Sequence, residues 1–261
     1  MSILKEIVKK KIIEVNNDKK EKLLLDLKKN LKKKNFSFRR QLINFKKKNK
    51  IAIIAEVKKA SPSKGILIKK FDYLKIATEY MNSGAACLSV LTEKNYFLGN
   101  KEYLRQIKKK INLPILCKDF FVDPYQVYEA SAIGADCILI LLKSTDIKLA
   151  KLLYKTALKC GLDSIIEVHD ENEMENALQF KEAIIGINNR NLDTFKTDIN
   201  TTIKIYKKFN LTNRLVICES GINSNKDIKK ITKETGIANF LIGESLIKSG
   251  SIRKKLKELV L

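Results

Sequence analysis

The chain has few of the residues that common catalytic and metal sites require. Among its 261 residues there is one histidine, His169, which argues against a histidine-based zinc site and against a Ser/His/Asp triad. Its five cysteines form no C-x-x-C pair, and all but Cys160 lie inside apolar runs: Cys87, Cys117, Cys137 and Cys218. We therefore expect buried free thiols in a reducing compartment, and no metal ion.

Long hydrophobic runs are also missing. No apolar stretch approaches the roughly 20 residues that span a bilayer. Charges interrupt the N-terminal MSILKEIVKKKIIEV too often for a signal peptide. We expect a soluble, cytoplasmic protein without a membrane partner. An apolar content of 44% is enough for a sizeable core, in one large α/β unit or two small ones.

The net charge is large, but little of it comes from arginine. A formal charge of +23 would attract a nucleic-acid backbone. Only six arginines contribute, at positions 39, 40, 105, 190, 214 and 253, although arginine is the usual bidentate partner of phosphates and bases. We interpret the lysine excess as a composition bias on exposed faces and predict no specific nucleic-acid partner. The alternative, a basic RNA-associated protein, rests on charge alone.

What the chain does contain is a repeated pattern: a short apolar run, a polar loop and a stretch of helical period. Runs without polar alternation indicate strands covered on both faces, and intervening helices imply parallel pairing. Eight runs occur, at residues 51–57, 86–91, 113–118, 136–142, 163–168, 183–188, 214–219 and 239–243. Their number and spacing predict the α/β class and a (β/α)8 TIM barrel. The alternative, a doubly wound sheet, usually carries a glycine-rich phosphate loop after its first strand, which SPSKG is not.

The first 48 residues do not follow this pattern. They hold two lysine-rich segments, the first with apolar residues at helical spacing: Ile3, Leu4, Ile7, Val8 and Ile12. We predict that residues 1–48 form an N-terminal helical extension packed on the barrel, rather than a disordered basic tail. Residues 49–261 would form the catalytic barrel domain.

Charged residues stand at the ends of the apolar runs. In the first run Glu56 and Lys58 share one face of the strand, because successive side chains alternate. The active site of such a barrel is built at the carboxyl ends of its strands, so these side chains would meet at one mouth. Further polar residues at run ends are Thr92, Glu93, Lys118, Asp119, Glu167, Asn188, Arg190, Glu219, Ser220 and Gly221. So many charges are costly to desolvate together, which indicates a functional pocket.

Two glycine-containing turns follow the last two runs. CESGI (218–222) and LIGES (241–245) stand where barrels commonly bind a phosphate through backbone N–H groups and a helix N-terminus. Glycine lets the backbone approach the anion closely. We therefore predict a small phosphorylated substrate.

Eight motifs follow one another between about residues 50 and 247: IAEVKKASPSKG, LSVLTEKNYFLGN, LPILCKDFFVDPYQVYEA, IGADCILILL, IIEVHDENE, IIGINNRNLDTF, VICESGI and FLIGESL. Together they resemble the indole-3-glycerol-phosphate synthase family. The resemblance implies a carbon–carbon (carboxy-)lyase of tryptophan biosynthesis. Its substrate would be 1-(2-carboxyphenylamino)-1-deoxyribulose 5-phosphate, which closes to indole-3-glycerol phosphate with loss of carbon dioxide and water.

The resemblance further implies no metal or organic cofactor. We expect a monomer, with association with other tryptophan-pathway enzymes left open. Another phosphosugar barrel, such as phosphoribosylanthranilate isomerase, would share the phosphate turns but not EVKKASPSKG or the motif around Lys118.

Catalytic roles also follow from the resemblance. Lys118 would be the general acid that protonates the substrate carbonyl as the aryl carbon attacks it. Glu167 would be the base, or base and then acid, of the dehydration. Lys58 and Glu56 would assist, and which of these groups moves which proton stays open.

Other residues would contact the substrate. Asn188 and Glu219 would hold the ribulose hydroxyls, and Arg190 would bind the anthranilate carboxylate as a two-pronged donor. The phosphate would be surrounded by Ser61, Ser220, Gly221, Gly243 and Glu244, and the aryl ring would lie against Phe97, Phe120, Leu139 and Leu192. Glu244 stands where a serine is common, so we expect its side chain to turn outward. We interpret His169 as a packing residue at a helix start.

Overall fold

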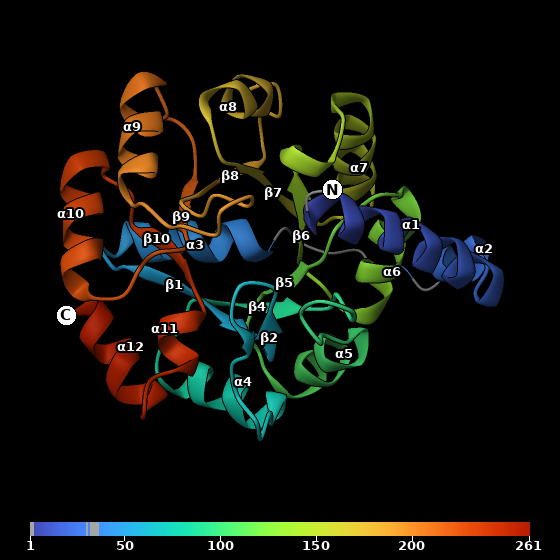
Figure 1. The fold of residues 1–261 in the computed structure, drawn as a ribbon, viewed down its shortest axis with the longest axis horizontal. Helices are drawn as coiled ribbons and strands as arrows, with labels where there is room; N and C mark the ends of the chain where they lie inside the picture. The colour runs from blue at the N-terminus through green and yellow to red at the C-terminus, as the bar shows by residue number, and fades with distance from the viewer. Residues whose placement is uncertain (1–2, 30, 32–36) are drawn as a thin grey trace.

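Eight parallel strands close into a barrel (Figure 1) in the computed structural model, which describes residues 3–29, 31 and 37–261. The barrel strands are β1 (Ala52–Val57), β4 (Cys87–Leu91), β5 (Ile115–Lys118), β6 (Cys137–Leu141), β7 (Asp163–Val168), β8 (Ile184–Asn188), β9 (Val216–Glu219) and β10 (Asn239–Ile242). They pair in chain order, and β1 pairs with both β4 and β10, which closes the cylinder. Each apolar run forms one of these strands, so the predicted barrel is confirmed. A short hairpin of β2 (Ala60–Ser61) and β3 (Gly65–Ile66) follows β1.

Helices alternate with the strands and surround the barrel in Figure 1. They are α4 (Tyr73–Asn82), α5 (Lys101–Lys110), α6 (Pro124–Ile133), α7 (Ile147–Lys159), α8 (Glu171–Ala177), α9 (Asn200–Lys208), α10 (Asn225–Thr235), α11 (Glu244–Ile247) and α12 (Ile252–Val260), with a 3-10 turn η1 (Leu142–Ser144) after β6. Helix α6 shows how local sequence sets their ends. Asp123 and Gln126 form a capping box at its start, and Gly134 ends it with a left-handed φ of 105°. None of the helices in the described part of the chain is long and apolar enough to cross a membrane.

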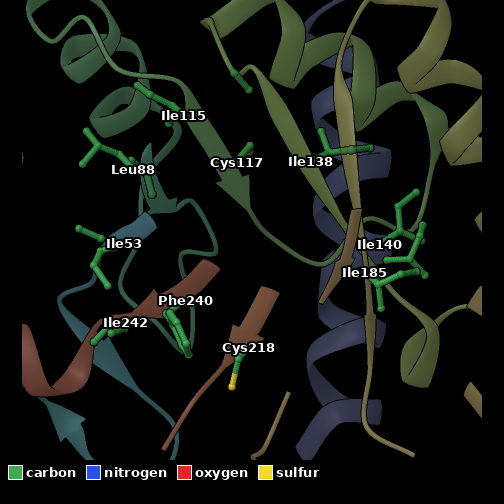
Figure 2. Packing of buried hydrophobic residues seen from close by; sticks show 14 of the residues in the cluster. Ile53, Leu88, Ile115, Cys117, Ile138, Ile140, Ile185, Cys218, Phe240 and Ile242 are labelled. Atoms are coloured by element: carbon green, nitrogen blue, oxygen red, sulfur yellow. The ribbon is translucent and has the colours of Figure 1, made fainter. Parts of the chain in front are cut away.

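Side-chain alternation along the strands produces two apolar layers. Residues such as Ile53, Ile138 and Phe240 face the helices and form the larger layer, part of which Figure 2 shows. Ile54, Leu116 and their equivalents on the other strands point into the barrel and fill it with a second, smaller layer. The cysteines divide between these layers, and all five are buried thiols that form no disulfide, as predicted.

Helix α3 (Ser37–Lys47) covers the amino ends of the strands. Its Phe38 and Leu42 belong to the apolar layer inside the barrel. Two polar contacts fix it there: Ser37 Oγ donates to Asp136 Oδ1 at 3.0 Å, and the Arg39 N–H donates to Asp163 Oδ2 at 2.9 Å. Asp163 is the first residue of β7, so α3 closes the end of the barrel opposite the carboxyl ends.

Helices α1 (Ile3–Glu21) and α2 (Leu24–Lys29) lie beside α6 in Figure 1. The buried face of α1 is not the apolar stripe alone. Ile12 is 46% exposed, whereas Lys11 is 1% exposed and its Nζ lies 2.8 Å from Asp119 Oδ1. The ion pair with Asp119, which is distant in sequence, therefore allows Lys11 to be buried while Ile12 is exposed. The second lysine-rich segment supplies the end of α1 and all of α2, and its residues 30 and 32–34 lie outside the described residues.

We expect Leu42→Ala to lower the free energy of unfolding by about 2–5 kcal/mol, because it leaves a cavity in the inner layer of the barrel. Leu25→Ala is the matched control. Leu25 is 67% exposed on α2, so its truncation should change stability by less than about 0.5 kcal/mol. Urea unfolding of the two variants measures both effects. Equal losses of unfolding free energy in the two variants would contradict the position of α3 at the amino end of the barrel.

Candidate active site

A pocket of about 400 Å³ opens at the carboxyl ends of the strands. Of the strand-end residues predicted to meet at the mouth, Thr92 and Glu93 do not line it: Thr92 binds Asp119, and Glu93 accepts backbone N–H groups of its own loop. With one further exception, the residues predicted to bind or act on the substrate do line it: Glu56, Lys58, Ser61, Phe97, Lys118, Phe120, Leu139, Glu167, Asn188, Arg190, Leu192, Ser220, Gly221, Gly243 and Glu244. The exception is Glu219, which is completely buried and reaches the site through Lys118. Strand ends far apart in sequence therefore meet in one cavity, as the barrel geometry requires.

Four titratable groups, Glu56, Lys58, Lys118 and Glu219, form a cluster at the inner end of this pocket. Lys118 Nζ lies 3.2 Å from Glu56 Oε2 and 3.3 Å from Glu219 Oε2. The other oxygen of Glu56 accepts a hydrogen bond from Lys58 Nζ. Glu56 thus binds both lysines, one through each carboxylate oxygen. The alternation predicted for β1 places Glu56 on the inner face of the strand.

The same cluster shifts the pKa values of its members in opposite directions. Burial favours the neutral carboxylic acid of Glu56, but the two lysines outweigh it and lower the pKa to about 2. Burial disfavours the charge on Lys118, yet Glu56, Glu219 and Glu167 raise its pKa well above the ordinary value. Lys118 is the one cationic partner of Glu219 among the described residues, so burial and the neighbouring Glu167 leave the pKa of Glu219 raised.

Glu167 stands apart from this cluster and has different partners. Its Oε1 accepts a hydrogen bond from Asn188 Nδ2 at 2.9 Å and lies 3.3 Å from His169 Nε2. Its Oε2 has no hydrogen-bond partner among the described residues. Burial opposes ionisation, but His169, Lys118 and Asn188 together lower the pKa of Glu167. The site therefore holds an ionised carboxylate with one uncommitted oxygen.

Two glycines make room for these carboxylates. A β-carbon at Gly186 on β8 would overlap with Glu219 Oε1, and one at Gly243 would lie 2.9 Å from the β-carbon of Glu56. Neither glycine has a positive φ, so the requirement is for space rather than for backbone freedom. Gly243, predicted for its backbone N–H, is therefore also needed to accommodate Glu56.

The outer rim of the pocket carries the two predicted anion-binding turns. In the turn after β9, Ser220 and Gly221 have φ values of 64° and 76°. A serine in the left-handed region costs about 1 kcal/mol or more, which is typical of functional sites. Gly243 precedes α11, which starts with Glu244. The Glu244 side chain does not turn outward as expected but lines the pocket, where its Oε2 lies 3.4 Å from Arg190 Nη2.

Comparisons with known proteins identify both the family of this chain and more distant proteins that share only its fold. The family model for indole-3-glycerol phosphate synthase matches residues 4–259. The chain belongs to this family. It is 42% identical over 259 residues to an indole-3-glycerol phosphate synthase from Legionella pneumophila strain Paris, covering 99% of this chain and 98% of that one. The protein of that name from Endomicrobium trichonymphae is 44% identical over 231 residues, 87% of this chain and 86% of its own.

Solved structures of two other activities share only the fold. Tryptophan synthase subunit alpha from Legionella pneumophila strain Paris gives a TM-score of 0.62 at 13% identity, covering 85% of this chain and 96% of that chain. Phosphoribosylanthranilate isomerase from Thermotoga maritima gives 0.56 at 13% identity, with 80% and 96% covered. The family predicted from the motifs is therefore confirmed. The chain is a lyase of tryptophan biosynthesis that acts on a small phosphorylated substrate.

Sequence reasoning missed the part of the pocket that the N-terminal helix supplies. Ile3, Leu4 and Ile7 of α1 line its rim. The apolar stripe signalled a buried face, but not what it would cover. Lys11 fixes α1 there through Asp119, which also accepts a hydrogen bond from Thr92 Oγ1 at 2.7 Å. Asp119 follows Lys118 directly, so the extension contacts the strand end that carries the predicted acid.

Glu56 and Glu219, the two buried glutamates that contact Lys118, should differ in how much stability the protein loses when each is replaced by a neutral glutamine. The pKa of Glu56 is lowered from 4.5 to about 2, so Glu56→Gln should lower the free energy of unfolding at pH 7 by roughly 3 kcal/mol. This deficit should shrink as the pH falls from about 4.5 towards 2, because the wild-type carboxylate then loses its charge.

Glu219→Gln is the matched variant. The pKa of Glu219 is raised, so its ionised form costs stability as the pH rises above about 4.5, and the amide should not destabilise the protein at pH 7. Urea unfolding at several pH values measures both differences. A loss in Glu219→Gln equal to that in Glu56→Gln would contradict the assignment.

Proposed function

We propose that this chain converts 1-(2-carboxyphenylamino)-1-deoxyribulose 5-phosphate to indole-3-glycerol phosphate, carbon dioxide and water, with the pocket residues in the roles derived below. The aryl carbon that carries the carboxylate attacks the ribulose carbonyl carbon. Carbon dioxide leaves that aryl carbon, and its bonding electron pair restores the aromatic ring. The new hydroxyl then leaves as water, and loss of a proton completes the indole.

Lys118 is the acid of the ring closure, and its position is the observation that carries this proposal. Its ammonium is held between Glu56 and Glu219, which fixes its direction and keeps it charged. Its raised pKa makes it a weak acid that gives up its proton only to a strongly basic oxygen. The alkoxide that forms as the carbonyl carbon is attacked is such an oxygen.

The carboxylates divide the remaining work according to their free oxygens. Both oxygens of Glu56 are bound to lysines, and its low pKa makes it a poor base. We therefore assign Glu56 to positioning Lys58 and Lys118. Oε2 of Glu167 has no hydrogen-bond partner among the described residues, so Glu167 is the base of the dehydration. Lys58 contacts the other oxygen of Glu56. We assign it as a second positively charged group that stabilises the hydroxyl as it leaves.

The substrate spans the pocket between its apolar wall and its anion-binding rim. Phe97 and Phe120 lie with ring centroids 6.2 Å apart and form one side of the aryl site. Ser220, Gly221 and Gly243 face the phosphate with backbone N–H groups. Arg190 binds the anthranilate carboxylate through its guanidinium, and in doing so exchanges the Glu244 carboxylate for that of the substrate.

We also propose that the protein is located in the cytoplasm, that it is a monomer and that it can associate with other enzymes of tryptophan biosynthesis. Sedimentation of the purified protein tests whether it is a monomer. A dimer at micromolar concentration would contradict it.

We expect purified protein to produce indole fluorescence from the carboxyphenylamino ribulose phosphate. Lys118→Ala should lower kcat by about 10²–10⁴-fold, because it removes the acid of the first step. Circular dichroism of the variant controls for folding. An unchanged kcat would mean that another group is the acid, whereas no fluorescence from the wild-type enzyme between pH 6 and 9 would reject the proposed reaction.

We expect Glu244→Gln to bind the anionic product more tightly, with a product Kd lower by about 3–10-fold. The carboxylate of Glu244 competes for Arg190 and repels the incoming phosphate, and the amide does neither at full strength. Glu258→Gln is the matched control, because Glu258 is also paired with a lysine, Lys255, but does not line the pocket. Equilibrium fluorescence titration measures the product affinity. Weaker binding by Glu244→Gln would mean that Glu244 assists phosphate binding.

A further inference from the structure

We propose that His169 is a positioning residue for Glu167, and that it acts as the middle member of a chain formed by Glu167, His169 and Glu173. The proposal deepens the function above and rests on it, since it takes Glu167 as the base of the dehydration. His169 is the only histidine of the protein, and the proposed reaction leaves it unused.

The imidazole lies between two carboxylates. Its Nε2 is 3.3 Å from Glu167 Oε1, and its Nδ1 is 3.1 Å from Glu173 Oε2. Glu173 belongs to α8, the helix that follows β7, and its Oε2 also accepts the backbone N–H of His169 at 2.8 Å. The side chain of His169 is 6% exposed and that of Glu173 is 15% exposed. Glu173 therefore holds His169 through one contact with the ring and one with its backbone, and Nε2 lies within ion-pair distance of Glu167 without a directed hydrogen bond.

This arrangement determines the charge of the ring. A ring that lies between two carboxylates is favoured as the cation, with a proton on each nitrogen, because both carboxylates attract its positive charge. Burial disfavours that cation, but Glu167 and Glu173 outweigh it and raise the pKa of His169 to about 9. The charged groups that face the ring are Glu167 at the end of β7 and Glu173 from α8, and Lys118 of β5 acts on the far side of Glu167.

The imidazolium has two effects on Glu167. It keeps the carboxylate ionised in a site where burial favours the neutral acid. It also lies against Oε1, the oxygen that accepts a hydrogen bond from Asn188, so the two residues together hold the carboxylate in one orientation. The orientation of the proposed base is thereby fixed from a helix outside the pocket. A residue that merely packed at the helix start would need neither carboxylate.

Steady-state kinetics of three variants test this role. His169→Phe keeps an aromatic ring but removes the charge and both donors, and we expect kcat to fall about 10–100-fold with little change in KM. His169→Gln retains an amide donor towards Glu167 and should recover part of that loss. Glu173→Gln leaves His169 in place and should give a smaller loss, which keeps the test valid if His169→Phe fails to fold. Equal activity of His169→Phe and the wild type would overturn the proposal.

A double-variant cycle tests whether His169 acts through Glu167. If it does, His169→Gln combined with Glu167→Gln should lower kcat no further than Glu167→Gln alone. Multiplicative losses would mean that His169 has a separate effect. Wild-type turnover is measured alongside, so a failure of the proposed function, which abolishes all rates, is distinguished from a failure of this inference.

The pH dependence gives a readout that a packing role would not alter. Wild-type kcat should fall as the pH rises through about 9, where the imidazolium loses its proton, and His169→Gln should lack that limb. Its acidic limb should move to higher pH, because Glu167 has lost a cation. The imidazole NMR signals of a single histidine need no assignment, and they should report a pKa near 9 that drops in Glu167→Gln and in Glu173→Gln. A value near the ordinary 6.5 in the wild type would overturn the proposal.

Discussion

The site depends on the ion pairs that Glu56 makes with Lys58 and Lys118. Burial would disfavour the charge on Lys118 without a carboxylate beside it, and Glu56 would not ionise there without the two lysines. The interaction joins β1 to β5 across the barrel mouth. The barrel must therefore close with the correct stagger before the pocket acquires its charge pattern, which couples folding to the chemistry of the site.

Three glutamates of the same intrinsic acidity acquire different tasks from their surroundings. Glu56 has two cations, Glu167 has an imidazolium, a lysine and an amide, and Glu219 has one lysine and a deeper burial. The order of their pKa shifts follows from that count of partners against the cost of burial. Gly186 and Gly243 belong to the same arrangement, because a β-carbon at either position would displace one of these carboxylates.

The N-terminal segment serves both ends of the barrel. Helix α3 fills the amino end with Phe38 and Leu42, whereas α1 brings Leu4 and Ile7 to the rim of the pocket. Lys11 connects α1 to Asp119, the residue after the predicted acid. The extension is therefore part of the structure that shields the pocket from water and fixes one of its strand ends.

The strands, the barrel and the ring of charged strand ends could be predicted from the sequence, because hydrophobic periodicity and side-chain alternation are local properties of the chain. Glu56 and Lys58 faced inward for that reason alone. The burial of Lys11 and the pairing of Glu244 with Arg190 could not be predicted in this way. Each depends on a charged partner brought close by the tertiary structure, and the energy of a buried charge is set by that partner and by the distance to it, neither of which a local pattern contains.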